Sequence, residues 1–246
     1  MRVLESRYGG FMSNAAASVQ LEVDILEKAP GDPHADLEVQ HEGKQWQLTR
    51  ADLRAEWDGS TGRGKVWQTA NPHSIDVVLR ILHTLLLAEK DGFLLHAASA
   101  VLGDRAFVFS GVSGAGKTTL SRLAPSSATV LTDEISLLKL EDGVFRAWGT
   151  PFSGEMATPG PNRSAKLARV FLLKKGPENV VEPMNPDEAV CAILRNVLFF
   201  ADDGDLGGRI LETTCRLVEK VPVKRLIFRP DASVWDFIAL LGVDCE

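Results

Sequence analysis

The sequence predicts an α/β fold in which a β-rich segment precedes a domain of alternating strands and helices. Apolar and polar residues alternate in short runs between residues 19 and 69, with turn residues between the runs, as is typical of half-buried strands. From residue 71 onward, short apolar runs alternate with longer segments of helical periodicity, which favours a layered domain. We therefore expect a β-rich segment over residues 1–70, packed on a second domain over residues 71–246.

The composition of the 246-residue chain excludes several classes of protein. Apolar residues make up 45% and charged residues 24%, which favours a globular protein over a disordered one. The net charge of −6 disfavours a nucleic-acid partner. The three cysteines are widely spaced and form no CxxC pair, so we expect no disulfide framework, no structural zinc site and a cytoplasmic location. No apolar run has the length of a signal peptide or a membrane span, so we expect no membrane contact.

The β-rich segment shows strand patterns but no chemistry. A strand is predicted over residues 19–25, a hairpin over residues 37–48, and a short strand over residues 65–69 after a glycine-containing turn. We expect these strands to be antiparallel. Two roles remain open for the segment, the recognition of a partner and the cover of one sheet edge.

The second domain begins with a predicted helix over residues 75–89, capped by Asn71 or Ser74. Strands are then expected over residues 93–101 and 106–110. The remaining expected elements are a helix from Lys117, a strand over 128–131, a hairpin over 135–148, a loop over 149–162, a strand over 167–173, helices over 187–199 and 208–219, a strand over 223–228 and a helix over 232–241.

A glycine-rich segment lies between the predicted strand 106–110 and the helix that begins near Lys117. It matches the P-loop (Walker A) pattern G-x-x-x-x-G-K-[ST] at every fixed position. Glycines allow the main chain to turn its N–H groups toward a phosphate chain, and the following helix N-terminus favours negative charge. We expect Lys117 to contact the β- and γ-phosphates and Thr118 to ligate Mg²⁺. The predicted nucleotide-binding residues are Gly111, Val112, Ser113, Gly114, Ala115, Gly116, Lys117, Thr118 and Thr119.

Two acidic residues, Asp133 and Glu134, follow the predicted strand 128–131. Because only one helix separates this strand from the glycine-rich segment, we expect strands 106–110 and 128–131 to be neighbours. One acid would then hold Mg²⁺, and the other would accept a proton from an attacking hydroxyl. The pattern alone leaves open which of Asp133 and Glu134 has which role. The alternative is an acidic pair at a solvated strand end.

Several further residues have weaker functional interpretations. His96 lies on the predicted strand 93–101, where a lone histidine is usually a packed core residue. Glu155 is a candidate additional acid and Arg163 a candidate phosphate clamp. Trp148 and Phe152 are candidates for an acceptor pocket, with packing as the alternative.

Together these motifs resemble the HPr kinase/phosphorylase and phosphoenolpyruvate carboxykinase type of P-loop protein. The segment from Gly111 to Leu120 is similar to the carboxykinase loop, and the resemblance covers roughly residues 72–242. Five further segments resemble the small HPr-kinase-like proteins of bacteria. They are Leu95-His96-Ala97-Ala98, Asp133-Glu134, Gly149-Thr150-Pro151, residues 219–226 and residues 228–232.

The resemblance implies a mixed, strongly curved sheet and phosphoryl transfer from ATP with Mg²⁺. It places His96 beside the transferred group, gives Asp133 a metal or base role, and suggests a homo-oligomer. The candidate catalytic residues are then Asp133, Glu134, His96 and Lys117, with Asp133 as the expected essential carboxylate and, with Thr118, the expected metal ligand. Three departures limit it. The second acid is Glu134, where HPr kinases carry an aspartate; the chain is far shorter than a carboxykinase; and residues 164–173 lack the later HPr-kinase signature, so HPr is not the expected acceptor.

Three functions are consistent with the motifs. The first is a kinase that transfers the γ-phosphoryl of ATP to a hydroxyl of a small molecule or of a serine in a peptide or protein. The second is an ATP-binding regulatory module with little or no transfer. The third, a P-loop hydrolase or GTPase, is disfavoured because the chain has no clear Asn-Lys-x-Asp run. The choice between ATP and GTP stays open.

Overall fold

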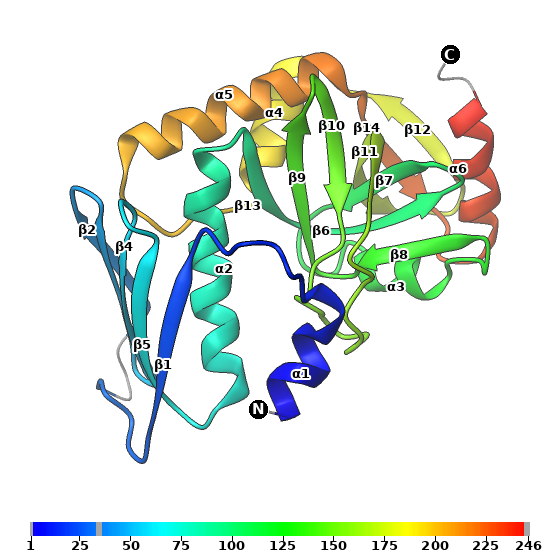
Figure 1. The fold of residues 1–246 in the computed structure, drawn as a ribbon. Coiled ribbons are helices and arrows are strands. Elements are labelled where there is room, and N and C mark those ends of the chain that lie inside the picture. The colour runs from blue at the N-terminus through cyan, green and yellow to red at the C-terminus, as the bar shows by residue number, and fades with distance from the viewer. Residues whose placement is uncertain (1, 33–35, 244–246) are drawn as a thin grey trace. The chain divides into compact units, whose positions relative to one another are not determined.

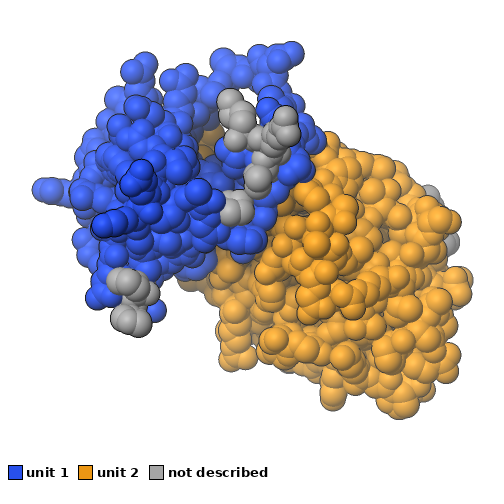
Figure 2. Space-filling view, turned by 90° about the horizontal axis from the view of Figure 1, so that it is seen from below, with its two compact units in different colours: residues 1–85, 199–204 blue, residues 86–198, 205–246 orange. Residues whose placement is uncertain are grey.

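The computed structural model describes residues 2–32 and 36–243 and divides them between two compact units. The first unit combines residues 1–85 with residues 199–204, and the second combines residues 86–198 with residues 205–246 (Figure 2). The division falls inside one helix, α2, rather than at residue 70. The boundary at residue 70 expected from the sequence stays a prediction.

A five-stranded sheet forms the first unit, with the strand order β1-β5-β4-β3-β2 (Figure 1). The predicted hairpin is confirmed as β2 and β3, and β4 is an additional strand. The expectation of a wholly antiparallel sheet is wrong at one edge, because β1 pairs with β5 in parallel. The elements of this unit are α1 (Arg2–Tyr8), η1 (Gly9–Phe11), β1 (Gln20–Leu26), β2 (Glu38–Glu42), β3 (Gln45–Arg50), β4 (Leu53–Asp58), β5 (Arg63–Thr69) and most of α2 (Pro72–Ala88).

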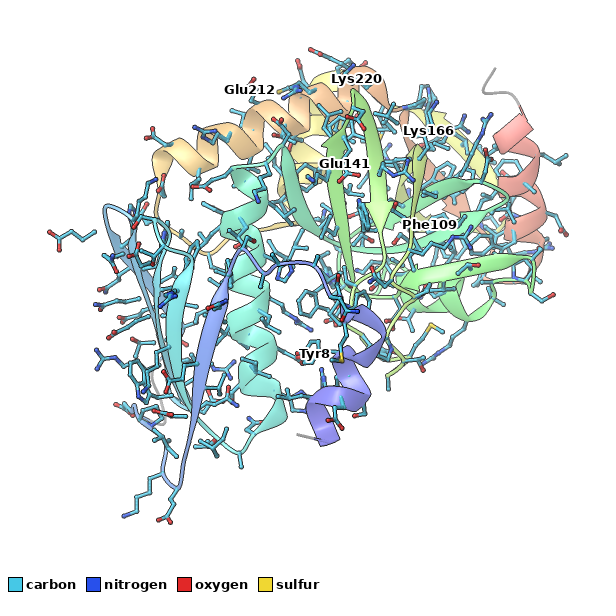
Figure 3. All side chains as sticks on the ribbon, viewed as in Figure 1. Tyr8, Phe109, Glu141, Lys166, Glu212 and Lys220 are labelled. Atoms are coloured by element: carbon cyan, nitrogen blue, oxygen red, sulfur yellow. The ribbon has the colours of Figure 1, made fainter. Side chains whose placement is uncertain are left out.

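The sheet of the first unit buries one face, as its alternating sequence requires. In β4 the buried positions are Leu53, Ala55 and Trp57, and the residues between them are more exposed. Helix α2 supplies a buried apolar stripe of its own at Ile75, Val78, Ile81, Leu82 and Leu85. Helix α1 is tied to α2 because Arg7 and Tyr8 both donate hydrogen bonds to the Asp76 carboxylate, and Figure 3 labels Tyr8 on α1.

A nine-stranded mixed sheet forms the second unit. The strand order is β10-β9-β6-β7-β11-β14-β12, and β10 also pairs with β11, so part of the sheet closes on itself. Strand β11 is parallel to β7 and β14, whereas the other pairings are antiparallel. The mixed α/β architecture expected from the sequence is therefore confirmed. The strands are β6 (Gly92–Leu102), β7 (Arg105–Ser110), β8 (Ala128–Thr132), β9 (Ile135–Glu141), β10 (Val144–Trp148), β11 (Ser164–Lys175), β12 (Val180–Pro183), β13 (Val197–Leu198) and β14 (Val223–Phe228).

Strand β6 pairs with four strands of the second sheet, β7, β8, β9 and β13. Strand β7 pairs along one of its edges, and β8 and β9 follow one another along the other edge. The predicted contact between strands 106–110 and 128–131 is therefore wrong, because β6 lies between them. Strand β6 has 11 residues and is therefore long enough to pair with both β8 and β9.

Helices cover both faces of this sheet. Strand β7 alternates between them, with Phe107 and Phe109 in one apolar cluster and Ala106 and Val108 in the other. Phe109, labelled in Figure 3, packs edge-on against Trp235, with 5.6 Å between the ring centroids. The first cluster includes residues of α3 (Lys117–Arg122) and α6 (Ser233–Val243), and the second includes residues of α4 (Pro186–Leu194) and α5 (Gly204–Lys220). Among the helices described, none combines the length and apolar character needed to cross a membrane.

Candidate functional site

The glycine-rich segment runs from the end of β7 to the start of α3, in the strand–loop–helix context expected from the sequence. Its backbone uses conformations that favour glycine, with φ of 155° at Gly111, 79° at Gly114 and 111° at Gly116. A Cβ atom at Gly116 would lie 2.6 Å from Cζ of Phe228. A larger residue at position 116 would therefore displace either the loop or the aromatic ring behind it.

Lys117, the first residue of α3, folds back along this loop. Its Nζ atom donates hydrogen bonds to the carbonyl oxygen of Gly111 at 2.8 Å and to that of Val112 at 3.4 Å. Only 8% of the residue is exposed, and this burial lowers the pKa of its ammonium group, while the negative charge of Glu134 raises the pKa in part. The lysine charge is thus held at the first residues of the loop.

The two acids lie at the junction of β8 and β9, one strand away from the loop. Ala97 of β6 pairs with Ser110 at the end of β7, and its N–H donates to the Glu134 carbonyl at 2.9 Å. Strand β6 therefore brings the acids near the loop, although β7 and β8 are not neighbours. Asp133 is 4% exposed, and its carboxylate accepts the N–H groups of Gly154 and Met156.

His96 also lies at this point of β6. Because β6 is antiparallel to β7 and Ala97 pairs with Ser110, the register places His96 beside the first residues of the loop. Its main-chain N–H donates to the carbonyl of Asn196 at 2.8 Å, and its side chain is half-buried.

One pocket of about 340 Å³ brings most of the predicted site residues together. The sequence reasoning missed Arg122, Lys175 and Gly154, which line the same pocket. Lys175 ends β11, and since β11 is parallel to β7, both strands end at the same edge of the sheet. The predicted residues that line the pocket are His96, Ser113, Gly114, Gly116, Lys117, Thr118, Thr119, Asp133, Glu134 and Glu155.

A second pocket of about 350 Å³ lies against the first residues of the loop. Gly111 and Val112 form one side of it, and α4 forms another through Cys191, Ala192 and neighbouring residues. Arg195 and Arg225 also line this pocket. The loop residues 111–114 therefore border two pockets, with Gly111 and Val112 at one and Ser113 and Gly114 at the other.

The two aromatic candidates for an acceptor pocket have other positions. Phe152 is 1% exposed, so it is a packed core residue, the alternative that the sequence left open. Trp148 and Arg163 are not among the residues that line either pocket.

Residues 73–239 match the protein family described as "SynChlorMet cassette protein ScmC". The chain belongs to the ScmC family. The matched residues run from α2 into α6 and include every residue that lines the two pockets of the second unit. No curated protein matches the chain.

The ScmC-family chain is also similar to a solved structure, the Hpr(Ser) kinase/phosphatase from Coxiella burnetii. The two share 10% sequence identity over 61% of this chain and 94% of the other, with a TM-score of 0.32. A likeness at this level supports no conclusion about function.

The charges around the first pocket of the ScmC-family chain have both signs. Lys117, Arg122 and Lys175 supply positive charge, and the exposed Arg122 and Glu155 form an ion pair at 3.4 Å. Within residues 2–32 and 36–243, no group of three or more His, Cys, Asp or Glu side chains is arranged to hold a metal.

Proposed function

We propose that this ScmC-family protein is an ATP-dependent kinase that transfers the γ-phosphoryl of Mg–ATP to a hydroxyl acceptor, a small molecule or a serine of a peptide or protein. The observation that carries the proposal is the convergence of the glycine-rich loop, Lys117 and two acids on one pocket. Each of these parts has a role in phosphoryl transfer, which depends mainly on positioning and on charge neutralisation.

The phosphate chain would bind between the loop and the cations of the pocket. The Lys117 ammonium group lies at the first residues of the loop, and Lys175 and Arg122 supply further positive charge from β11 and α3. The main-chain N–H groups at the start of α3 favour an anion, as helix N-termini do in other phosphate sites.

The oxygen donors at the pocket fit Mg²⁺. The hydroxyl of Thr118 and a carboxylate of the acidic pair are hard ligands, and Mg²⁺ commonly combines one or two carboxylates with phosphate oxygens and water. The ion would neutralise negative charge on the phosphate groups during transfer. This donor set also agrees with the absence of an all-protein metal cluster from the described residues.

The acceptor would approach from the second pocket. Lys117, expected to contact the terminal phosphates, is bonded to the carbonyls of Gly111 and Val112, and these two residues also line that pocket. The acceptor oxygen would form a bond to phosphorus while the bond to the β–γ bridging oxygen breaks and ADP leaves. The hydroxyl proton would pass to a side chain of the first pocket that can accept it, and His96 would lie beside the transferred group.

The experiment that tests this function uses ATP labelled in the γ-phosphoryl group, with Mg²⁺. Free hydroxy amino acids, sugars and a serine-containing peptide are offered in turn. We expect labelled product from one acceptor class, and no labelled product from the Lys117→Ala variant. Nucleotide binding without transfer to any acceptor would contradict the kinase and support the regulatory module. Repeated release of labelled phosphate without an acceptor would support a hydrolase.

A further inference from the structure

The loop between β10 and β11 contributes Gly154 and Glu155 to the first pocket. Two hydrogen bonds fix the middle of this loop. The N–H of Gly154 donates to Oδ1 of Asp133 at 2.8 Å, and the N–H of Met156 donates to Oδ2 at 2.9 Å. Both carboxylate oxygens of Asp133 are therefore engaged with the main chain of the loop.

Other contacts hold the same loop against the β8–β9 junction. The Thr150 hydroxyl donates to the Ile135 carbonyl at 2.7 Å, and the Thr132 hydroxyl donates to the Phe152 carbonyl at 3.3 Å. A Cβ atom at Gly154 would lie 3.0 Å from Oδ2 of Asp133, so the glycine allows the close approach of the loop to the acid. Together with these contacts, Asp133 holds the β10–β11 loop in place.

Glu134 has a different environment from its neighbour. Its main chain is fixed on both sides, because its N–H donates to the Thr132 hydroxyl and its carbonyl accepts the N–H of Ala97. The residue is half-buried and lines the pocket. Lys117, which is expected to contact phosphate, lines the same pocket. Glu134 and the expected phosphate-binding lysine therefore border one pocket.

We propose that Glu134 is the carboxylate that would hold the metal, and that Asp133 is a positioning residue that acts through the loop. The proposal rests on the proposed function and assigns Asp133 a different role from the metal ligand expected from the sequence. Through the loop, Asp133 fixes Glu155, which pairs with Arg122 of α3. Loosening the loop would change where Arg122 lies relative to a bound phosphate chain.

The test compares Asp133→Asn and Glu134→Gln with Thr150→Val, which loosens the loop without changing either acid. The affinity for ATP is measured by calorimetry with and without Mg²⁺. We expect Glu134→Gln to lose about tenfold or more of the strengthening that Mg²⁺ gives, because a metal ligand is removed. Asp133→Asn and Thr150→Val should weaken ATP binding by the same factor with and without Mg²⁺. A selective loss of the Mg²⁺ effect in Asp133→Asn would overturn the proposal.

Amide hydrogen exchange gives a second measurement that needs no nucleotide. In Asp133→Asn the amides of Gly154 and Met156 should exchange faster, since an asparagine side chain accepts at only one of its two terminal atoms. Glu134→Gln should leave these rates unchanged. Unchanged rates in Asp133→Asn would overturn the positioning role even if ATP binds as expected. If the wild-type protein binds no nucleotide, the proposed function and the role of Glu134 fall together, and the exchange rates still decide the role of Asp133.

Discussion

Gly116 shows how single residues shape the loop that the proposed function requires. Its φ of 111° and the 2.6 Å approach of a Cβ atom to Phe228 impose separate penalties on a substitution. Gly103, in the turn between β6 and β7, has a φ of 64° but open space where a Cβ atom would lie. A substitution at Gly103 therefore tests backbone strain alone, whereas one at Gly116 tests backbone strain and steric contact together.

We expect Gly103→Ala to cost about 1 kcal/mol of stability, from backbone strain alone. Gly116→Ala should cost about 1–3 kcal/mol more, because the added methyl group is forced against an aromatic ring. Denaturant unfolding of the two variants measures the difference. Equal costs would show that the loop and Phe228 separate without penalty.

Residues near one another in the sequence were the more predictable part of the site. Lys117 and Thr118 follow from the local P-loop pattern, and the acids from their place shortly after it, whereas His96 needed a family resemblance as well. Lys175 was missed because its place depends on the parallel pairing of β11 with β7. No local pattern contains that information, although a predicted strand that ends in lysine beside the loop strand would have suggested it.

At the scale of elements, the β8–β9 junction depends on one hydroxyl group. The Thr132 Oγ1 atom accepts the N–H groups of Glu134 and Ile135, both at 3.2 Å, and donates to the Phe152 carbonyl. The junction therefore keeps its hydrogen bonds where the pairing with β6 passes from β8 to β9.

We expect Thr132→Val to destabilise the protein by about 2 kcal/mol or more, because buried N–H groups lose their acceptor while the side-chain shape is kept. Thr129→Val is the matched control on the same strand, since the Thr129 hydroxyl has no hydrogen-bond partner among the described residues. Urea unfolding measures both. A loss of equal size at the two positions would contradict the role given to Thr132.

Helix α1 offers a second prediction at this scale. Tyr8 is the single tyrosine of the chain, and burial together with its hydrogen bond to Asp76 raises its pKa well above the ordinary value. The folded protein thus holds the Tyr8 proton more tightly than the unfolded chain does. The resulting stabilisation is complete below about pH 10, the pKa of unfolded tyrosine, and is lost as the pH rises toward the raised value.

Asp76→Asn should lower the pKa of Tyr8 part of the way to its ordinary value, because the negative charge is lost while the burial remains. Phenolate absorbance near about pH 11 should therefore be low in the wild-type protein and higher in the variant. Identical titration curves would show that Asp76 does not anchor α1.

Elements with strong periodicity were the ones that the sequence located well. The pattern of residues 75–89 predicted α2, and the two runs before the glycine-rich loop predicted β6 and β7. Strand β4, whose sequence Leu53–Asp58 carries three charged residues, was missed. The pairing of β8 with β6 was also missed, since neighbour relations in a sheet are set by long-range packing and not by the length of the connection.

At the scale of the whole molecule, the chain divides its apolar residues between two units, and the pocket of the proposed function lies entirely in the second. The chain order does not reveal this division, because residues 199–204 join the first unit from within the sequence of the second. His41 of β2 and Asp203 form an ion contact at 3.5 Å inside the first unit. The return of residues 199–204 to the first unit depends on tertiary contacts, which a sequence pattern does not predict.

Ligand binding should therefore act unequally on the two units. Saturating Mg–ATP should slow amide exchange across residues 111–122 and at Glu134, because a ligand stabilises the unit that binds it, by about 2.7 kcal/mol at a concentration 100 times its Kd. Strands β3 and β4 should exchange at an unchanged rate. Protection confined to the first unit would place the nucleotide elsewhere.

The most direct test of nucleotide binding is calorimetric titration with ATP and GTP, each with and without Mg²⁺, on the wild-type protein and Lys117→Ala. Lys174→Ala is the control, since Lys174 is an exposed neighbour of Lys175 that does not line the pocket. We predict saturable, Mg²⁺-dependent binding by the wild-type protein and by Lys174→Ala, with binding lost in Lys117→Ala. No saturable heat from either nucleotide at millimolar concentration, or equal binding by Lys117→Ala, would contradict a nucleotide site at the glycine-rich loop.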